Sequence, residues 1–263
     1  MQGVPGTTAS EKTSHYLKTE DDIRLYLSWP FQPPPVDVTL YHDLERSVGD
    51  GGVVTYRLMD ALGVAGGNLA AEFMALLTVD NPRLLLRLVE TLAERIYTHV
   101  QAVLEAGARP IFHLSGSEYA TPPLMRPQQF DEFVMPFDRP LIELMHRHGC
   151  KVLVHCHGRV NAVLERFIAM GADGLHPLEA PPMGDITLAD AKRRVGDRLC
   201  FIGNLQIGDM MRAEPHEIRA QVRRIRQDVP TGMILSTSAT PYETVLSERL
   251  LANYIAALEA AAE

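Results

Sequence analysis

The chain has 263 residues and a formal net charge of −8, so it lacks the positive charge of a nucleic-acid-binding protein and no nucleic-acid partner is expected. An apolar share of 46% and a charged share of 22% are typical of a globular domain, and no apolar run approaches the roughly 20 residues of a membrane span. Cys150, Cys156 and Cys200 are too few for a disulfide framework, which predicts reduced thiols and a cytoplasmic location.

The predicted elements begin after a polar leader. We expect residues 1–18 to be disordered and residues 19–263 to form one barrel domain. In chain order, the predicted elements are helix 19–29, strand 53–58, helix 81–106, strand 110–114, helix 127–148, strand 151–155, helix 159–170, strand 173–176, helix 188–195, strand 198–202, helix 215–228, strand 233–235 and helix 247–262.

The alternation of short apolar strands with helices predicts an α/β fold in which parallel strands are joined by right-handed helical crossovers. A TIM-like (β/α)8 barrel fits this order best, with an incomplete N-terminal part because only six strands are found. An open doubly wound sheet is the alternative. It is weakened because the chain has no glycine fingerprint for a nucleotide.

Polar side chains follow the predicted strands, where the active sites of parallel barrels form. They are Tyr56, Arg57, His113, Ser115, Ser117, Glu118, Tyr119, His155, His157, His176, Glu179, Asn204, Gln206, Ser236 and Ser238. We take Glu118, Tyr119 and Asn204 as candidate catalytic residues. Glu118 is suited to act as a metal ligand, a general base or a substrate clamp, and a solvated loop carboxylate is the alternative.

The sharpest motif is His155-Cys156-His157-Gly158, at the end of a strand that reads as buried on both faces. Side chains alternate along a strand, so both imidazoles point to one side and Cys156 to the other. Two same-facing imidazoles suit zinc, and Glu179, His176, Glu118 and His113 are the candidates for further ligands. Hydrogen bonding of both histidines to neighbours in a polar strand end is the alternative.

The stretch from Arg126-Pro127 through Val154–Gly158 and Gly171–Leu175 to Phe201–Asn204 resembles the uroporphyrinogen decarboxylase-like superfamily. The resemblance implies a TIM-like barrel. This superfamily includes zinc-dependent corrinoid methyltransferases, in which a His-x-Cys-Gly motif and a later Cys bind zinc. Here His155 matches the first position, His157 stands at the Cys position, and the later Cys is replaced within residues 236–238.

From this resemblance we expect a zinc-dependent methyltransferase that uses a corrinoid or related donor and a small thiol-type acceptor. Its metal ligands would be His155, His157, Glu179 and His176, and its partners a small-molecule substrate, a corrinoid protein and a second copy in a homodimer. The alternatives are a decarboxylase or lyase that uses the histidines as acid and base, a metal-assisted hydrolase, and a non-catalytic barrel. The arginine-rich substrate motif of the decarboxylase branch is not found.

Overall fold

The computed structural model describes residues 2–3, 10–11 and 14–263. The chain divides into two compact units. The N-terminal unit comprises residues 15–156 and 162–173, and the C-terminal unit comprises residues 1–14, 157–161 and 174–263. Among the described residues, no helix has the length and apolar character needed to cross a membrane.

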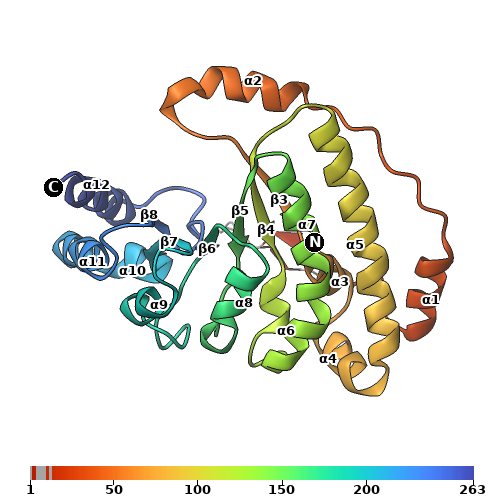
Figure 1. Cartoon of the computed structure of the whole chain (residues 1–263). Helices are drawn as coiled ribbons and strands as arrows, with labels where there is room; N and C mark the ends of the chain where they lie inside the picture. Colours follow the sequence, from red (N-terminus) through yellow and green to blue (C-terminus); the bar gives the residue numbers. More distant parts are fainter. Residues whose placement is uncertain (1, 4–9, 12–13) are drawn as a thin grey trace. The chain divides into compact units, whose positions relative to one another are not determined.

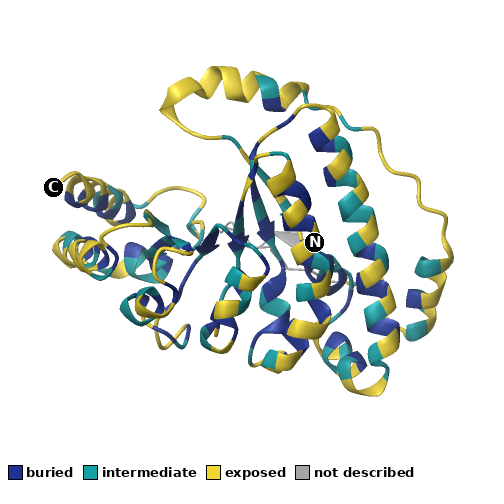
Figure 2. Ribbon diagram, in the orientation of Figure 1, coloured by how far each residue is buried: buried dark blue, intermediate teal, exposed yellow. Residues whose placement is uncertain are grey.

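The N-terminal unit is built on three parallel strands, β3 (Thr55–Met59), β4 (Ile111–Ser115) and β5 (Lys151–His155). Their register places Met59 beside Ser115 and Ser115 beside His155, so the carboxyl ends of the strands are level. The apolar side chains of Phe112, Leu114, Val152 and Val154 are almost completely buried, as Figure 2 shows for this sheet.

Within the described part of the chain, eight α-helices belong to the same unit (Figure 1). They are α1 (Glu20–Ser28), α2 (Thr39–Val48), α3 (Ala61–Asn68), α4 (Ala71–Asp80), α5 (Pro82–Glu105), α6 (Pro127–Phe133), α7 (Met135–Arg147) and α8 (Leu164–Ala169). The long α5 packs against α3, α4 and α7. Its apolar face, which includes Leu85, Leu88 and Val89, is fully buried.

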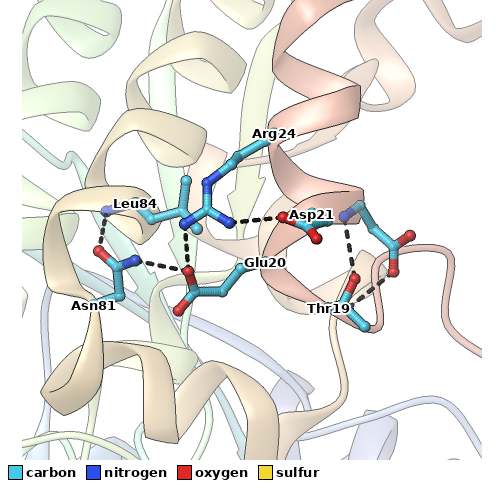
Figure 3. A network of polar contacts seen from close by, with 7 residues as sticks. Thr19, Glu20, Asp21, Arg24, Asn81 and Leu84 are labelled. Carbon is cyan, nitrogen blue, oxygen red and sulfur yellow. Dashed lines mark hydrogen bonds and ion pairs between the residues drawn. The ribbon is translucent and has the colours of Figure 1, made fainter.

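A polar network fastens α1 to the start of α5 (Figure 3). Thr19 caps α1, and its hydroxyl accepts a hydrogen bond from Asp22 N. The Glu20 carboxylate accepts hydrogen bonds from Arg24 at 2.5 Å and from Asn81 Nδ2 at 3.0 Å. Asn81 in turn caps α5 by accepting from Leu84 N, so one network caps the N-termini of two helices.

The C-terminal unit also holds three parallel strands, β6 (Gly174–His176), β7 (Cys200–Leu205) and β8 (Met233–Thr237). Its helices are α9 (Leu188–Val195), α10 (Ile207–Arg212), α11 (Pro215–Asp228) and α12 (Glu248–Ala262). Helix α12 packs along α11 and α10. The buried amide of Asn253 ties it to α10 by donating to the carbonyl oxygens of Met210 and Ala213.

The structure confirms the α/β class and all six predicted strands, three in each unit. Four helices were not predicted: α2, α3, α4 and α10. The predicted helix 127–148 is two helices. The helix is interrupted at Val134, and Pro136 lies in the first turn of α7. The predicted helix 159–170 is shorter, since its first part is the 3-10 turn Asn161–Val163.

The leader predicted to be disordered lies mostly outside the described residues. Of those that are described, Gln2–Gly3 (β1) pairs antiparallel with Ser10–Glu11 (β2). Leu17 is buried and forms a bridge with Leu69. The boundaries of residues 1–18 and 19–263 stay predictions.

Candidate functional site

A cavity of about 900 Å³ lies in the C-terminal unit at the ends of its parallel strands. Strand β7 supplies Asn204 and, just after it, Gln206, and Ser238 follows β8. The loop after β6 supplies Glu179, and His157 comes from the short segment 157–161. The cavity therefore has the position expected of an active site in a parallel α/β fold.

Glu179 and His157 form the central pair of this cavity. Glu179 is 5% exposed, and its Oε2 lies 3.3 Å from His157 Nδ1. The same oxygen accepts a hydrogen bond of 2.8 Å from Gly158 N. Burial alone would favour the neutral acid, but the His157 ring, the Gly158 N–H and the Gln206 side chain outweigh it and hold the pKa of Glu179 below its ordinary value. Glu179 is therefore ionised at neutral pH.

Gly184 fixes the loop that carries Glu179. A Cβ at position 184 would lie 1.9 Å from the carbonyl oxygen of Glu179 and 2.9 Å from that of Gly158. Gly184 N also donates to Ala180 O, which closes the turn. Only glycine permits this close backbone approach, so the sequence itself folds the loop back over Glu179.

Gln206 and Ser238 form a second polar group in the cavity. Ser238 Oγ donates to Gln206 Oε1 at 3.1 Å and accepts from Ile207 N. Gln206 Nε2 is buried and has no hydrogen-bond partner within 3.5 Å among the described residues, while the Gln206 side chain lies close enough to Glu179 to help lower the pKa of that carboxyl. A buried donor of this kind is rare in native structures. It is suited to donate to an oxygen atom of a bound ligand.

His176 and Asn204 mainly hold the site together. The ring of His176 lies with Nε2 3.0 Å from Thr237 O, and since a carbonyl oxygen only accepts, Nε2 must carry the proton. A metal would then be bound through Nδ1. Asn204 Oδ1 accepts from Leu178 N at 3.1 Å, so this predicted catalytic residue anchors the loop after β6.

In the N-terminal unit, His155 lies beside His113 on the neighbouring strand. Their rings meet edge to face with centroids 5.4 Å apart, and one nitrogen of each lies within 4.8 Å of the other. Cys156 is fully buried, as alternation along the strand predicts. His155 thus contacts His113 while His157 contacts Glu179. That His155 and His157 bind one ion stays a prediction.

Glu118 and Tyr119 lie in the 3-10 turn Ser117–Ala120, here η2. Glu118 Oε2 accepts a hydrogen bond of 3.0 Å from Gly116 N. The ring of Tyr119 lies over Gly66, where a Cβ would come within 2.7 Å of it. Burial, and then the charges of Glu118 and Asp60, raise the pKa of Tyr119, so its hydroxyl keeps its proton.

Residues 61–247 match the family model for uroporphyrinogen decarboxylase. The chain belongs to this family. It is 28% identical to the uroporphyrinogen decarboxylase of Aliivibrio salmonicida over 155 residues, or 57% of this chain and 38% of the relative. It is 30% identical to that of Pseudomonas putida strain GB-1 over 151 residues, or 56% and 39%. The chain thus spans about two fifths of the length of these curated relatives.

A solved structure, that of a methyltransferase from Methanosarcina mazei, matches 82% of this chain and 61% of its own with a TM-score of 0.67 and 19% identity. This likeness establishes the fold. The predicted TIM-like architecture is confirmed, with six parallel strands where a complete barrel has eight.

Gln206 is among the residues that the sequence placed after a strand, but nothing in the sequence indicated Arg212, whose basic side chain also lines the cavity. Arg212 lies on helix α10, which was not predicted, and it belongs to no motif in the sequence.

Proposed function

We propose that the chain is a metal-dependent methyltransferase that holds zinc through His157 and Glu179. The transfer would run between a corrinoid or related donor and a small thiol-type acceptor bound in the cavity. The observation that carries the proposal is the buried, ionised Glu179 with an imidazole nitrogen 3.3 Å away. A corrinoid protein as the methyl-carrying partner, and a homodimer, belong to the same proposal.

The donor set fits zinc. Imidazole nitrogen and carboxylate oxygen both bind zinc at about 2.0–2.2 Å, and two such ligands at the tetrahedral angle are about 3.4 Å apart. The observed 3.3 Å between His157 Nδ1 and Glu179 Oε2 agrees with this spacing. The charge of Glu179 would also replace part of what the absent cysteine thiolates supply in the methyltransferase branch.

The other predicted ligands are His155 and His176. His155 has a second nitrogen donor, His113, beside it, and His176 keeps Nδ1 for a metal because Nε2 is bound to Thr237 O. Their membership in the same coordination sphere is a prediction from sequence. Metal analysis of single variants tests each of them separately.

Bound zinc supplies a Lewis acid that lowers the pKa of a coordinated thiol. The chain's own residues would do the rest. Glu179 keeps its negative charge in the cavity because Gly158 N and His157 stabilise it. Gln206 Nε2 is placed to donate to a polar atom of the substrate, and Asn204 holds the loop in position.

Decarboxylation of a carboxylated small molecule is the second candidate, because the curated relatives are named as uroporphyrinogen decarboxylases. In that case His157 and Glu179 would work as a metal-free acid and base pair. Arg212, which lines the cavity, would offer a cation for a substrate carboxylate.

Metal content separates the two candidates. Protein purified without added zinc should contain close to one zinc per chain, and His157→Ala and Glu179→Gln should each weaken zinc binding by more than about 100-fold, because even indirect supports of a ligand contribute 10–100-fold. His216→Ala and Glu248→Gln, at exposed positions of the same unit, are the matched controls.

Activity provides the second readout. Demethylation of methylcobalamin in the presence of 2-mercaptoethanol should depend on zinc and be abolished by chelation. If chelated protein instead decarboxylates a porphyrinogen carboxylate and loses that activity in His157→Ala, the methyltransferase proposal is wrong and the decarboxylase candidate is correct.

A further inference from the structure

We infer that the N-terminal unit has a binding site of its own, built on α1, for a small molecule with a quaternary ammonium group. A cavity of about 340 Å³ lies there, and its lining includes three aromatic side chains and one carboxylate, those of Tyr16, Tyr26, Trp29 and Asp22. All of them belong to the N-terminal unit, whereas the proposed zinc ligands His157 and Glu179 belong to the C-terminal unit. The inference therefore goes beyond the proposed function and does not depend on it.

One face of α1 forms a wall of this cavity. Asp22, Leu25 and Tyr26 line it, and Trp29 follows directly after the helix. These positions are spaced i, i+3, i+4 and i+7, so their side chains lie on the same side of the helix. Ile23 lies off this face and is completely buried, which fixes α1 on the unit. The helix therefore presents two aromatic rings and an acid to the same space.

A second part of the chain completes the cavity. Leu17 N donates to Asn68 O at 3.1 Å, and Leu17 pairs with Leu69 in a parallel bridge. Leu17 is buried and anchors this short segment to the end of α3, so Tyr16 is held beside the cavity that it lines. Aromatic rings from two separate segments thus line one space.

Two of these rings are exposed to an uncommon degree. Tyr16 is 82% exposed and Trp29 is 61% exposed. Burial of large aromatic side chains is favourable, so exposed rings beside a cavity indicate a surface that binds a ligand. The faces of Tyr and Trp rings are the negative part of their quadrupole and attract cations. Tyr26 already makes such a contact, because the Arg95 guanidinium lies over its ring, 4.8 Å from the centroid.

Asp22 adds a negative charge to the rings. Its Oδ2 accepts hydrogen bonds of 2.9 Å from Lys18 N and Thr19 N. The bond from Lys18 N, followed by those from Thr19, lowers the pKa of Asp22, so the carboxylate is ionised at neutral pH. No basic side chain is found among the described residues that line the cavity. The site therefore combines ring faces with a negative charge and leaves the place of the cation to a ligand.

The polarity of the cavity selects the class of cation. A primary ammonium group is strongly hydrated and has three N–H donors to satisfy, whereas Asp22 and Asn68 are the only polar side chains besides the tyrosine hydroxyls in the described lining. A quaternary ammonium group has no N–H, and ring faces are the surfaces that proteins use to bind it. A volume of about 340 Å³ is suited to a small molecule.

The fluorescence of Trp29 tests the site directly. Trp29 is the only tryptophan of the chain, so its emission reports on this cavity alone. Titration of the full-length chain with choline chloride should change the emission saturably, with a dissociation constant in the millimolar range. The compound 3,3-dimethyl-1-butanol has the shape of choline with carbon in place of the charged nitrogen, and it should bind at least about tenfold more weakly. Sodium chloride at equal ionic strength is the control. An unsaturable response to choline, or equal binding of the neutral alcohol, overturns the inference.

Variants at exposed positions test the individual groups. Tyr16→Leu should weaken choline binding about fivefold, and Trp29→Leu, followed by calorimetry, about tenfold, because each replaces a ring face with an aliphatic side chain. Asp22→Asn should weaken the binding of choline but not that of the neutral alcohol. Tyr254→Leu, on α12, is the matched control. Wild-type affinity in both Tyr16→Leu and Trp29→Leu contradicts the inference. If a variant fails to fold, the comparison of choline with its neutral analogue in the wild type still decides.

Two further measurements separate the sources of the ligand from other occupants. Co-sedimentation with phosphatidylcholine vesicles that free choline reverses would show that the trimethylammonium group belongs to a lipid. Choline binding without co-sedimentation would show that it belongs to a soluble compound. Sedimentation equilibrium covers a second copy of the chain as the occupant. A dimer that choline neither binds nor dissociates would mean that the second copy covers the rings, and the inference would be wrong.

Discussion

The two units bury carboxyl groups in opposite protonation states. In the C-terminal unit, Glu179 is 5% exposed and its pKa lies below the ordinary value. In the N-terminal unit, Asp138 is 2% exposed and its pKa is raised to about 8. The two groups are buried to a similar degree, so burial alone does not decide their charge.

The difference is in the partners. Glu179 receives the Gly158 N–H and faces the ring of His157, which together stabilise the anion. Among the described residues, one oxygen of Asp138 has no hydrogen-bond donor, and burial raises the pKa of this acid. An ionised buried acid can bind a cation, whereas an acid that keeps its proton is neutral and can donate a hydrogen bond inside the protein. Four changes test this comparison.

Glu179→Gln should have the largest effect. It retains the shape of the side chain but removes the charge, so zinc binding and methyl transfer should both fall, the latter by about 1,000-fold or more since a transition-state interaction worth some 4 kcal/mol is lost. Turnover of methylcobalamin and equilibrium dialysis against zinc measure the two losses. Activity within about tenfold of the wild type would show that the ionised carboxylate is not required.

Asp138→Asn should change the pH dependence of stability. The folded chain keeps a proton that the unfolded chain releases near pH 4, so the free energy of unfolding of the wild type should fall as the pH rises from about 4 through about 8. Between pH 5 and pH 7 the fall should be about 2–3 kcal/mol, since each unit contributes up to 1.4 kcal/mol. Urea unfolding at several pH values measures it. The variant should lose this slope, and Asp80→Asn should keep it.

Gly184→Ala should separate loop geometry from charge. The added methyl group meets the carbonyl oxygen of Glu179, so the loop must shift at a cost of about 1–3 kcal/mol and zinc affinity should fall by about tenfold. Gly67→Ala, where a Cβ meets open space within α3, is the control and should lower neither quantity, because alanine favours a helix more than glycine does. Thermal unfolding and zinc titration provide the measurements. Wild-type zinc affinity in Gly184→Ala would mean that the loop position does not matter.

Glu20→Gln should have the smallest effect. This carboxylate has two partners, Arg24 and Asn81, but its side chain is 36% exposed, so water screens the interaction. We expect a loss of about 0.5 kcal/mol in the free energy of unfolding, measured by urea denaturation. A loss above about 2 kcal/mol would show that the hydrogen-bond partners of an exposed carboxylate stabilise the fold as much as those of a buried one.

The elements that the sequence predicts best have clear periodic patterns and end signals. Helix α11 and strand β5 have the predicted bounds, because Pro215 begins the helix and a continuous apolar run forms the strand. Helix α3 was missed because Gly63, Gly66 and Gly67 are typical of a loop. Its glycines are instead needed for close packing against Gly116 and Tyr119.

The sequence predicted which residues lie in the site better than it predicted which of them contact one another. His157 and Glu179 follow the strand ends expected to form an active site, and the structure brings these two together. The contact of His155 with His113 depends on strand pairing, which the sequence does not specify. Asp60 and Asp138 were missed, since an aspartate in a sequence is usually exposed and only packing reveals that these two are buried.

X-ray absorption at the zinc edge of the zinc-loaded chain tests the central claim most directly. We predict a first shell of nitrogen and oxygen ligands with imidazole scattering, from which His157→Ala removes one imidazole and Glu179→Gln one oxygen. His216→Ala should leave the spectrum unchanged. A spectrum that is the same in the wild type, His157→Ala and Glu179→Gln would contradict the account.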